Sequence, residues 1–223
     1  MRKTINNIRV AIFDLDGTLL DSTHVWEDID DKFLSKRGYA PTPEYHRGIA
    51  ALGNREVANF TIEFYGLSDT PDELMAEWFD MAIDAYSHTV ELFPHAGEYV
   101  RDVAARGIVI YAVTSLSREL AIPCLDRHGL TELFREVITS DECGLSKSSP
   151  DIFTYTARRA GVKPCECVVF DDVAAALRSA KSAGMTTVAV RGDNSYVHGG
   201  EPVDGVADYA VADFSEAPII DNK

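Results

Sequence analysis

The spacing of apolar residues changes twice along the chain. The continuous apolar run IRVAIF at residues 8–13 predicts a buried strand. Between about residues 20 and 90 the apolar residues recur at helical intervals instead, and the next run that predicts a strand is IVIYAV at 108–113. The helical intervals are clearest in three stretches, at residues 25–34, 55–65 and 72–86. This part of the chain therefore predicts an all-helical segment inserted after the first strand.

Beyond residue 90, strand and helix patterns alternate. Strands are predicted at residues 108–113, 137–139, 167–170 and 186–190, and helices at 94–106, 117–128, 150–161 and 173–183. Because apolar strands that alternate with helices form parallel sheets covered on both faces, we expect a doubly wound α/β core. We expect this core at residues 1–19 and 91–223, and a helical cap domain at residues 20–90.

Composition and charge limit the classes of partner. The chain has 223 residues, of which 46% are hydrophobic, so a packed core is expected. Its formal net charge of -15 at pH 7 would oppose binding to nucleic acid or to an anionic membrane. We expect a monomer or a weak homodimer, with an acidic tail from Asp213 that lies in solvent.

The chain carries no pattern typical of secretion or of a membrane span. The apolar stretch after the basic segment MRKTINN ends at Asp14, which is too early for a signal sequence, and no apolar run is long enough to cross a bilayer. The four cysteines have neither the spacing of a zinc site nor the density of a disulfide framework. We therefore expect reduced thiols and a cytoplasmic location.

Four of the expected strands end on side chains that can bind ions or take part in chemistry. These are Asp14 with Asp16, Thr114 with Ser115, Lys147 in the loop after the third strand, and Asp171 with Asp172. Each is ordinary in a loop, but a doubly wound sheet brings the carboxyl ends of its strands to one edge, where such folds bind ligands. We therefore expect these residues to converge.

The expected cluster holds four carboxylates and one ammonium group, so it needs a cation if it is partly buried. Oxygen ligands favour a hard ion, and Mg²⁺ suits a site with a few carboxylates and room for water and a phosphate group. A calcium loop of the EF-hand type does not fit, because the glycine of DLDGTLLDSTHVWE comes too early. If residues 14–17 were simply a strand that ends in a turn, this would account for Gly17 but not for the expected convergence of the charged side chains.

The segment FDLDGTLLDS at residues 13–22, followed in order by Thr114, Lys147 and the pair Asp171 and Asp172, resembles the four motifs of the haloacid dehalogenase-like (HAD) hydrolase superfamily. The resemblance extends over residues 8–190 and is closest to the phosphatase and β-phosphoglucomutase-like branch. It implies a Rossmann-like α/β core with an inserted helical cap. It also implies a Mg²⁺-dependent phosphatase that acts on a small phosphorylated metabolite.

The resemblance further implies hydrolysis through an aspartyl-phosphate intermediate. Asp14 would be the nucleophile, and Asp16 would protonate the leaving oxygen and then activate water. Thr114, the backbone amide of Ser115 and the side chain of Lys147 would hold the phosphoryl group.

The family pattern also supplies an expected ligand set for Mg²⁺. The ion would be bound by the Asp14 carboxylate, the Asp16 backbone carbonyl and the Asp172 carboxylate, with Asp171 acting through water. Val173 departs from the pattern, because a serine is common after the fourth motif.

A β-phosphoglucomutase-like phosphomutase remains open, because those enzymes share all four motifs and the same kind of cap. Arg55, within residues 53–56, is similar to a substrate-binding arginine of the mutases and is a candidate contact for a second anionic group. Trp26 stands where the mutases carry a hinge histidine, and Leu116 and Ser117 lie where they carry a lysine. We therefore favour a phosphatase.

Two other classes are less favoured. A dehalogenase of the superfamily needs neither Asp16 nor a metal ion, and a catalytically idle phosphate-binding protein has no chemical reason to keep both Asp14 and Asp16. The cap residues His24, His46 and Trp78 are interpreted as surface or packing residues.

Overall fold

The computed structural model describes residues 2–22, 24–49, 52, 54–191, 203 and 205–223. The chain forms two compact units, which we call the α/β unit (Met1–Ser22 and Val90–Lys223) and the helical unit (Thr23–Thr89). Within the described residues, no helix combines the length and the apolar character that a membrane span requires.

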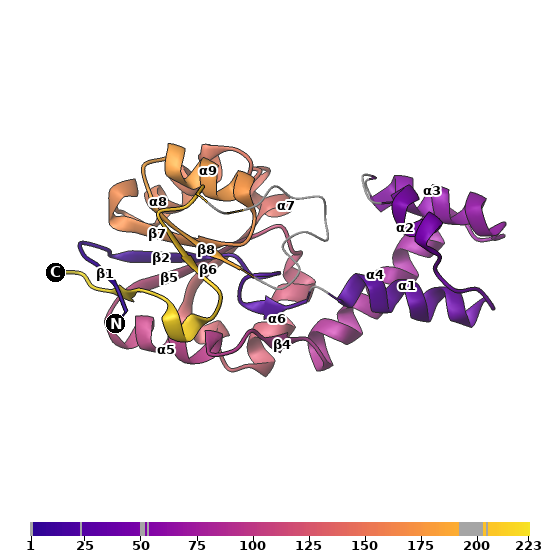
Figure 1. Ribbon diagram of the computed structural model, residues 1–223, viewed down its shortest axis with the longest axis horizontal. Coiled ribbons are helices and arrows are strands. Elements are labelled where there is room, and N and C mark those ends of the chain that lie inside the picture. Colours follow the sequence, from indigo (N-terminus) through magenta and orange to yellow (C-terminus); the bar gives the residue numbers. More distant parts are fainter. Residues whose placement is uncertain (1, 23, 50–51, 53, 192–202, 204) are drawn as a thin grey trace. The chain divides into compact units, whose positions relative to one another are not determined.

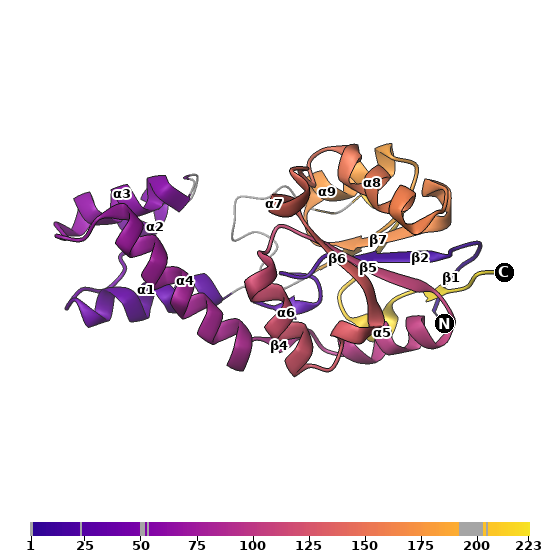
Figure 2. The same cartoon turned by 180° about the vertical axis from the view of Figure 1, so that it is seen from behind.

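The α/β unit is built on a six-stranded parallel sheet with the strand order β6-β5-β2-β7-β8-β9. The strands are β2 (Val10–Phe13), β5 (Val109–Thr114), β6 (Phe134–Thr139), β7 (Cys167–Asp171), β8 (Thr186–Val190) and β9 (Tyr209–Val211). The helices are α5 (Ala96–Ala105), α6 (Arg118–Arg127), α7 (Ser140–Cys143), α8 (Pro150–Ala160) and α9 (Ala174–Ser182), with 3-10 turns at Thr131–Leu133, Pro164–Glu166 and Phe214–Glu216. Helices α5 and α6 cover one face of the sheet, and α8 and α9 cover the other (Figures 1 and 2). The doubly wound fold predicted from the sequence is confirmed.

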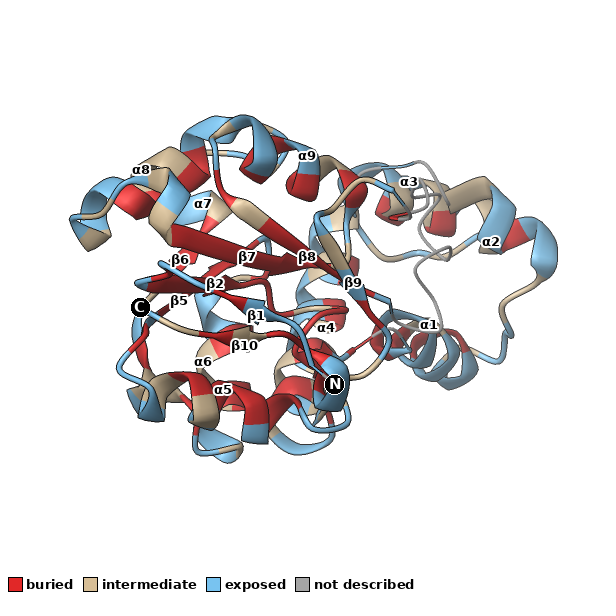
Figure 3. Ribbon diagram, turned by 60° about the vertical axis from the view of Figure 1, so that its left-hand side comes forward, coloured by how far each residue is buried: buried red, intermediate tan, exposed pale blue. Residues whose placement is uncertain are grey.

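The central strand β2 explains the continuous apolar run near the start of the chain. All four of its residues are buried, because neighbouring strands flank it and helices cover both faces of the sheet (Figure 3). The chain builds β5 and β6 on one side of β2 and then returns to build β7, β8 and β9 on the other. The strand order therefore reverses at β2. Doubly wound sheets bind ligands next to the carboxyl ends of the strands between which the order reverses.

Two pairs of very short strands do not follow from the apolar pattern. Strand β3 (Leu20–Asp21) pairs antiparallel with β4 (Glu91–Leu92), and β1 (Thr4–Ile5) pairs in parallel with β10 (Ile219–Ile220). A two-residue strand has no measurable period, so the sequence pattern contains no signal for it. The pair β3 and β4 lies where the chain leaves and re-enters the α/β unit.

The prediction that the tail from Asp213 lies in solvent is wrong. Phe214 and Ile220 are both buried, and the ring centroid of Phe214 lies 5.5 Å from that of Tyr99 on α5. The Tyr99 hydroxyl also donates a hydrogen bond to the carbonyl of Pro218 at 2.7 Å. The few apolar residues of the tail outweigh its charge, because burying each ring or branched side chain contributes roughly 1.5–3 kcal/mol.

The described residues of the helical unit form four helices, three of which match the helical intervals predicted at residues 25–34, 55–65 and 72–86, whereas the short helix at residues 43–49 was not predicted. The four helices are α1 (Val25–Lys36), α2 (Pro43–Ile49), α3 (Asn54–Tyr65) and α4 (Pro71–His88). Helix α4 begins with a capping box in which the Thr70 side chain accepts from the Glu73 amide and the Glu73 carboxylate accepts from the Thr70 amide. Its buried face meets α1 where Phe33 and Trp78 pack edge to face, with centroids 5.4 Å apart. The interpretation of Trp78 as a packing residue agrees with this burial.

Helices α1, α2 and α3 meet around the buried ring of Tyr45. Its hydroxyl lies 3.0 Å from the Thr61 hydroxyl and donates to the Asp30 carboxylate at 3.4 Å. Burial raises the pKa of Asp30 to about 6, although His46 and the Tyr45 hydroxyl act in the opposite direction. Asp30 is therefore a carboxyl group that the folded helical unit favours in its protonated form.

The raised pKa of Asp30 makes stability depend on pH in a defined direction. Its contribution is present below its unfolded pKa and is lost as the pH rises through its folded pKa. As the pH rises from about 5 to about 7.5, we expect the free energy of unfolding of Asp30→Asn to increase by about 1 kcal/mol relative to that of the wild type. This is less than the full shift in the pKa of Asp30 implies, because the residue is only partly buried. Urea unfolding at both pH values measures this difference. Asp28→Asn is the control, because Asp28 is exposed on the same helix and is not among the groups that shift the pKa of Asp30. If the difference in stability between the wild type and Asp30→Asn did not change with pH, the assignment would be contradicted.

Candidate active site

Strand β2 ends at Asp14, at the point where the strand order reverses. The Asp14 amide still donates to the Phe170 carbonyl of β7 at 2.9 Å, so its backbone continues the sheet. The chain then turns back, because the amides of residues 18–20 all donate to the carbonyl of Leu15 at 2.8–3.2 Å. The turn fixes the direction of the Asp14 side chain, which is almost fully buried.

Gly17 is required in this turn for two reasons. Its φ angle of +75° lies in the left-handed region that side chains disfavour. A β-carbon added to Gly17 would also overlap the carboxylate of Asp172. The absence of a side chain therefore lets the Asp172 carboxylate pack directly against the turn that follows Asp14.

The ammonium group of Lys147 joins two strand ends. Its Nζ lies 2.8 Å from Asp14 Oδ1 and 2.9 Å from Asp171 Oδ2, and only 11%, 4% and 1% of the three side chains are exposed. The Thr18 hydroxyl lies 3.4 Å from Asp14 Oδ2 and 3.3 Å from Asp172 Oδ1. Four of the residues that the sequence analysis expected to converge, Asp14, Lys147, Asp171 and Asp172, therefore do so.

The cluster is short of positive charge. Burial raises the pKa of Asp172 well above its usual range, and the neighbouring charges of Asp14 and Asp171 raise it further. Burial also raises the pKa of Asp171, although Lys147 acts against this. Burial alone would lower the pKa of Lys147, but the two carboxylates that it contacts outweigh burial and raise it. Lys147 thus stays charged, while among the described residues Asp172 has no ion pair and is influenced by Lys147 only at longer range.

The donor atoms fit a hard divalent cation. Carboxylate oxygens of Asp14, Asp171 and Asp172 lie within 4.8 Å of one another. Asp171 is already engaged at both oxygens, because Oδ2 faces Lys147 and Oδ1 accepts from the Val173 amide at 2.8 Å. Within the described part of the chain, Asp14 Oδ2 and Asp172 Oδ1 have only the longer contacts with the Thr18 hydroxyl, at 3.4 and 3.3 Å, so Asp14 and Asp172 are the carboxylates best suited to hold Mg²⁺ directly.

Asp16 lies in a different environment from Asp14. It is only partly buried, its carboxylate is not among the three that approach one another, and its Oδ1 accepts a hydrogen bond from the Ser22 hydroxyl at 2.8 Å. Ser22 is the last residue before the chain enters the helical unit. The two aspartates of the first motif are thus held by different partners.

The end of β5 supplies two further candidate residues. Thr114 is fully buried, and its hydroxyl accepts from the Leu116 amide at 3.1 Å, whereas Ser115 is exposed. Helix α6 begins three residues later with Arg118, whose guanidinium group binds both carboxylate oxygens of Glu142 at 2.6 and 2.7 Å. Strand β5 lies beside β2 in the sheet, so Thr114 ends at the same edge as Asp14.

The candidate contact Arg55 and the histidines of the helical unit are exposed. Arg55 pairs with Asp72 at 2.6 Å near the starts of α3 and α4, and both side chains are exposed. His24 and His46 are exposed as well, and 42% of Trp26 is accessible. Gly53, from the segment that suggested Arg55, lies outside the described residues. A substrate contact by Arg55 therefore stays a prediction.

Sequence reasoning missed two hydroxyl groups that hold the carboxylates of the first motif. Thr18 lies between Asp14 and Asp172, and Ser22 binds Asp16. Both residues belong to FDLDGTLLDS, but hydroxyl residues are common in turns. Their spacing alone carries no signal for a particular partner.

Comparison with known proteins agrees with this geometry. The family model described as haloacid dehalogenase-like hydrolase matches residues 11–190. The bifunctional riboflavin kinase/FMN phosphatase of Arabidopsis thaliana is 29% identical over 81% of this chain and 48% of its own length, and a phosphoglycolate phosphatase of Pseudomonas fluorescens is 27% identical over 96% and 76%. A solved structure from Thermotoga maritima described as a β-phosphoglucomutase has a TM-score of 0.78 at 23% identity, covering 92% of this chain and 94% of that one. The chain thus spans about half the length of the Arabidopsis enzyme.

The charge balance of the cluster predicts that Lys147 is essential for stability. Without added metal ion, we expect Lys147→Met to lose about 3–5 kcal/mol in free energy of unfolding, because it leaves buried carboxylates without a counter-charge. The loss should shrink at lower pH, as those carboxyl groups become protonated. Urea unfolding in the presence of a chelator measures both effects.

Lys181→Met is the matched control. Lys181 pairs with Asp208 at 2.8 Å, but 48% and 36% of these side chains are exposed. Removing this exposed pair should cost less than about 1 kcal/mol. Equal losses for the two lysine variants would contradict the assignment of Lys147.

Proposed function

Because the chain belongs to the haloacid dehalogenase-like hydrolase family, we propose that it is a Mg²⁺-dependent phosphatase that hydrolyses a small phosphorylated metabolite. The observation that carries the proposal is the cluster of Asp14, Lys147, Asp171 and Asp172 at the reversal of the strand order. The phosphatases among its relatives act on chemically different substrates. These relatives support a phosphate ester as the class of substrate, but they do not point to one particular compound.

The first step is transfer of the phosphoryl group to Asp14. A carboxylate oxygen of Asp14 attacks phosphorus, and the bond between phosphorus and the ester oxygen breaks. Asp16 donates a proton to that leaving oxygen, so the product departs as an alcohol. Lys147 contacts Asp14 and offsets charge on the nucleophile and on the phosphoryl group.

The second step returns Asp14 to its starting form. Asp16, now deprotonated, takes a proton from water, whose oxygen attacks phosphorus as the bond to Asp14 breaks. The products are inorganic phosphate and a free Asp14 carboxylate. The Ser22 hydroxyl donates a hydrogen bond to one oxygen of Asp16 at 2.8 Å and so keeps this carboxyl group in place as it changes from acid to base.

The remaining residues bind and orient the phosphoryl group. Thr114 and the backbone amide of Ser115 provide donors at the end of β5. Asp14, the Asp16 carbonyl and Asp172 would hold Mg²⁺, which supplies positive charge next to the phosphate oxygens when bound. Asp171 keeps Lys147 in position, because it contacts that ammonium group at 2.9 Å.

We assign the role of a cap to the helical unit, which is inserted between Ser22 and Val90. In this assignment the cap selects the substrate, and Arg55 is its candidate contact for a second anionic group. Arg55 would have to exchange its partner Asp72 for the substrate. Because that pair is exposed, the exchange costs little.

A β-phosphoglucomutase-like activity is the second candidate, favoured by the cluster that it would share with a phosphatase. The region after Thr114 argues against it. Ser117 provides no ammonium group, and the nearby Arg118 is held by Glu142 and by the Val137 carbonyl at 2.8 Å. The phosphatase therefore remains the better supported function.

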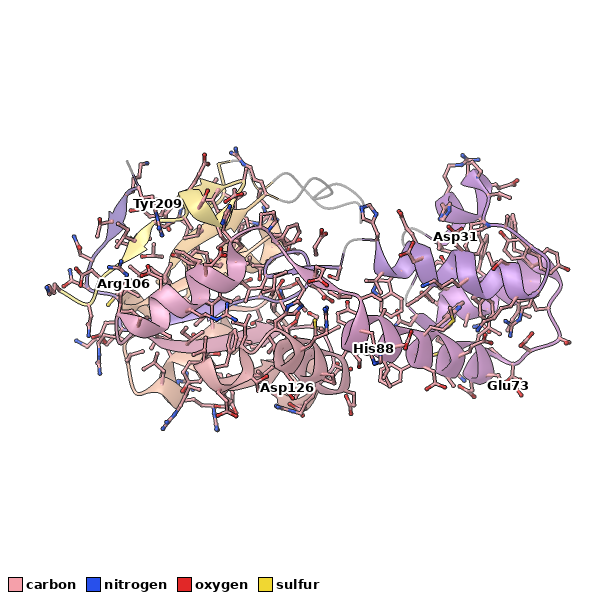
Figure 4. The ribbon with its side chains drawn as sticks, turned by 90° about the horizontal axis from the view of Figure 1, so that it is seen from below. Asp31, Glu73, His88, Arg106, Asp126 and Tyr209 are labelled. Carbon is pink, nitrogen blue, oxygen red and sulfur yellow. The ribbon has the colours of Figure 1, made fainter. Side chains whose placement is uncertain are left out.

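Release of inorganic phosphate tests the proposal. We expect the wild type to hydrolyse at least one member of a panel of sugar phosphates, nucleotides and an aryl phosphate, and only with Mg²⁺. Asp14→Asn should abolish turnover, and Asp16→Asn should reduce it by about 10²–10⁴-fold because it removes the acid and base. Asp126→Asn is the control of equal charge, since Asp126 is exposed on α6 (Figure 4).

Three results would count against this function. Turnover by Asp14→Asn equal to that of the wild type, or no turnover on any substrate, would contradict the mechanism. Formation of glucose 6-phosphate from β-glucose 1-phosphate would select the mutase instead.

A further inference from the structure

The chain re-enters the α/β unit at Val90, whose backbone carbonyl is hydrogen-bonded to a residue of α6 and to the residue that caps its C-terminus. Val90 is the first residue after the helical unit, and it is buried. Its carbonyl accepts a hydrogen bond from His128 Nε2 at 2.9 Å and from the Cys124 thiol at 3.8 Å. Because a carbonyl oxygen can only accept, Nε2 of His128 carries the hydrogen. The re-entry point is therefore fixed by two donors at the C-terminal end of one helix.

The residues after Val90 are tied to the same helix and to the first motif. The Glu91 carboxylate pairs with Arg127 at 3.0 Å, next to His128. Strand β4 pairs with β3, and the Phe93 amide donates to the Leu19 carbonyl at 2.9 Å. The re-entry segment, residues 90–93, thus connects α6 with the turn that follows Asp14 and Asp16.

Helix α5 holds the same region from another direction. A β-carbon on Gly97 would lie 2.9 Å both from Leu92 Cδ1 and from Arg101 Nη1, so the glycine allows both groups to approach the helix. Arg101 in turn donates to the His128 carbonyl at 2.8 Å. The backbone and the side chain of His128 are therefore both held in place.

The opposite end of α6 adjoins Thr114 and Ser115, which the proposed function assigns to phosphate binding and which we call the phosphate loop. The helix begins at Arg118, three residues after Ser115, and its ten residues span roughly 15 Å. Arg118 anchors this end through Glu142 and the Val137 carbonyl. Pro123 lies inside α6 and removes one hydrogen bond from its ladder, but the helix continues from Arg118 to Arg127. Because it is fixed at both ends and closely packed, it can transmit small displacements.

We propose that α6 mechanically couples the phosphate loop to the re-entry segment, with His128 as the positioning residue at its far end. Binding of a phosphate group at Thr114 and Ser115 then reduces the motion of the re-entry segment, which directly follows the helical unit in the chain. This proposal rests on the proposed function, because it takes that loop as the phosphate site. His128 acts through Val90 and does not contact the substrate.

His128 is the stronger of the two donors to Val90. Burial raises the pKa of Cys124 to about 12, so it remains a thiol, and thiols are weak donors. A leucine at position 128 would leave the buried carbonyl with that weak donor alone. A glutamine offers an amide donor of similar reach, so it should restore the coupling that leucine removes.

Hydrogen–deuterium exchange at the Phe93 amide measures the coupling without turnover. In the wild type, inorganic phosphate with Mg²⁺ should slow this exchange at least about fivefold, the lower end of usual coupling between sites. His128→Gln should keep most of the effect, and His128→Leu should lose it. The wild-type measurement needs no variant, so the test holds even if His128→Leu folds poorly.

Kinetics provide a second measurement. If the coupling positions the helical unit for substrate, His128→Leu should raise KM at least about fivefold with a smaller change in kcat, because fewer molecules are competent to bind. His128→Gln should stay near the wild type. A residue with a purely structural role would lower the amount of folded enzyme and leave KM unchanged.

The outcomes separate this proposal from the proposed function. An absence of phosphate-dependent protection at Phe93, or equal protection in His128→Leu, would overturn the coupling even in an active phosphatase. Protection that depends on His128 in a protein without phosphatase activity would support the coupling and contradict the proposed function.

Discussion

The contact of the Lys147 ammonium group with the buried carboxylates of Asp14 and Asp171 is the interaction on which the site depends. It lets two strand ends carry like charges next to each other in the interior. It does not balance Asp172, whose pKa is raised by burial and by its two acidic neighbours. Under the proposed function, a second cation offsets the charge that an ionised Asp172 would carry. A phosphate group could then approach Asp14 with less repulsion.

The rest of the α/β unit makes this arrangement possible. The reversal of the strand order brings β2 and β7 side by side, and the missing side chain of Gly17 lets Asp172 approach the turn after Asp14. Asp16 is kept apart by the Ser22 hydroxyl. Two aspartates separated by one residue therefore lie in different surroundings, because the fold gives Asp14 a lysine and Asp16 a hydroxyl group, as the two roles proposed for them require.

The sequence predicted the features that depend on local pattern. The apolar run before Asp14 predicted the central strand, and the alternation of strands and helices predicted the convergence of Asp14, Lys147, Asp171 and Asp172. It did not predict that Phe214 and Ile220 would carry an acidic tail into the core, or that His128 would hold the Val90 carbonyl. Such contacts join residues far apart in the chain. Neither periodicity nor residue type encodes them without the fold.

The proposed function requires that the carboxylate cluster bind a metal ion before it accepts a phosphate group. Isothermal titration of the wild type with inorganic phosphate, with Mg²⁺ and then with a chelator, tests it directly. We expect binding at least about tenfold tighter with Mg²⁺, a difference of about 1.4 kcal/mol, and a smaller ratio for Asp172→Asn. Equal affinity for phosphate with and without Mg²⁺ would contradict this requirement.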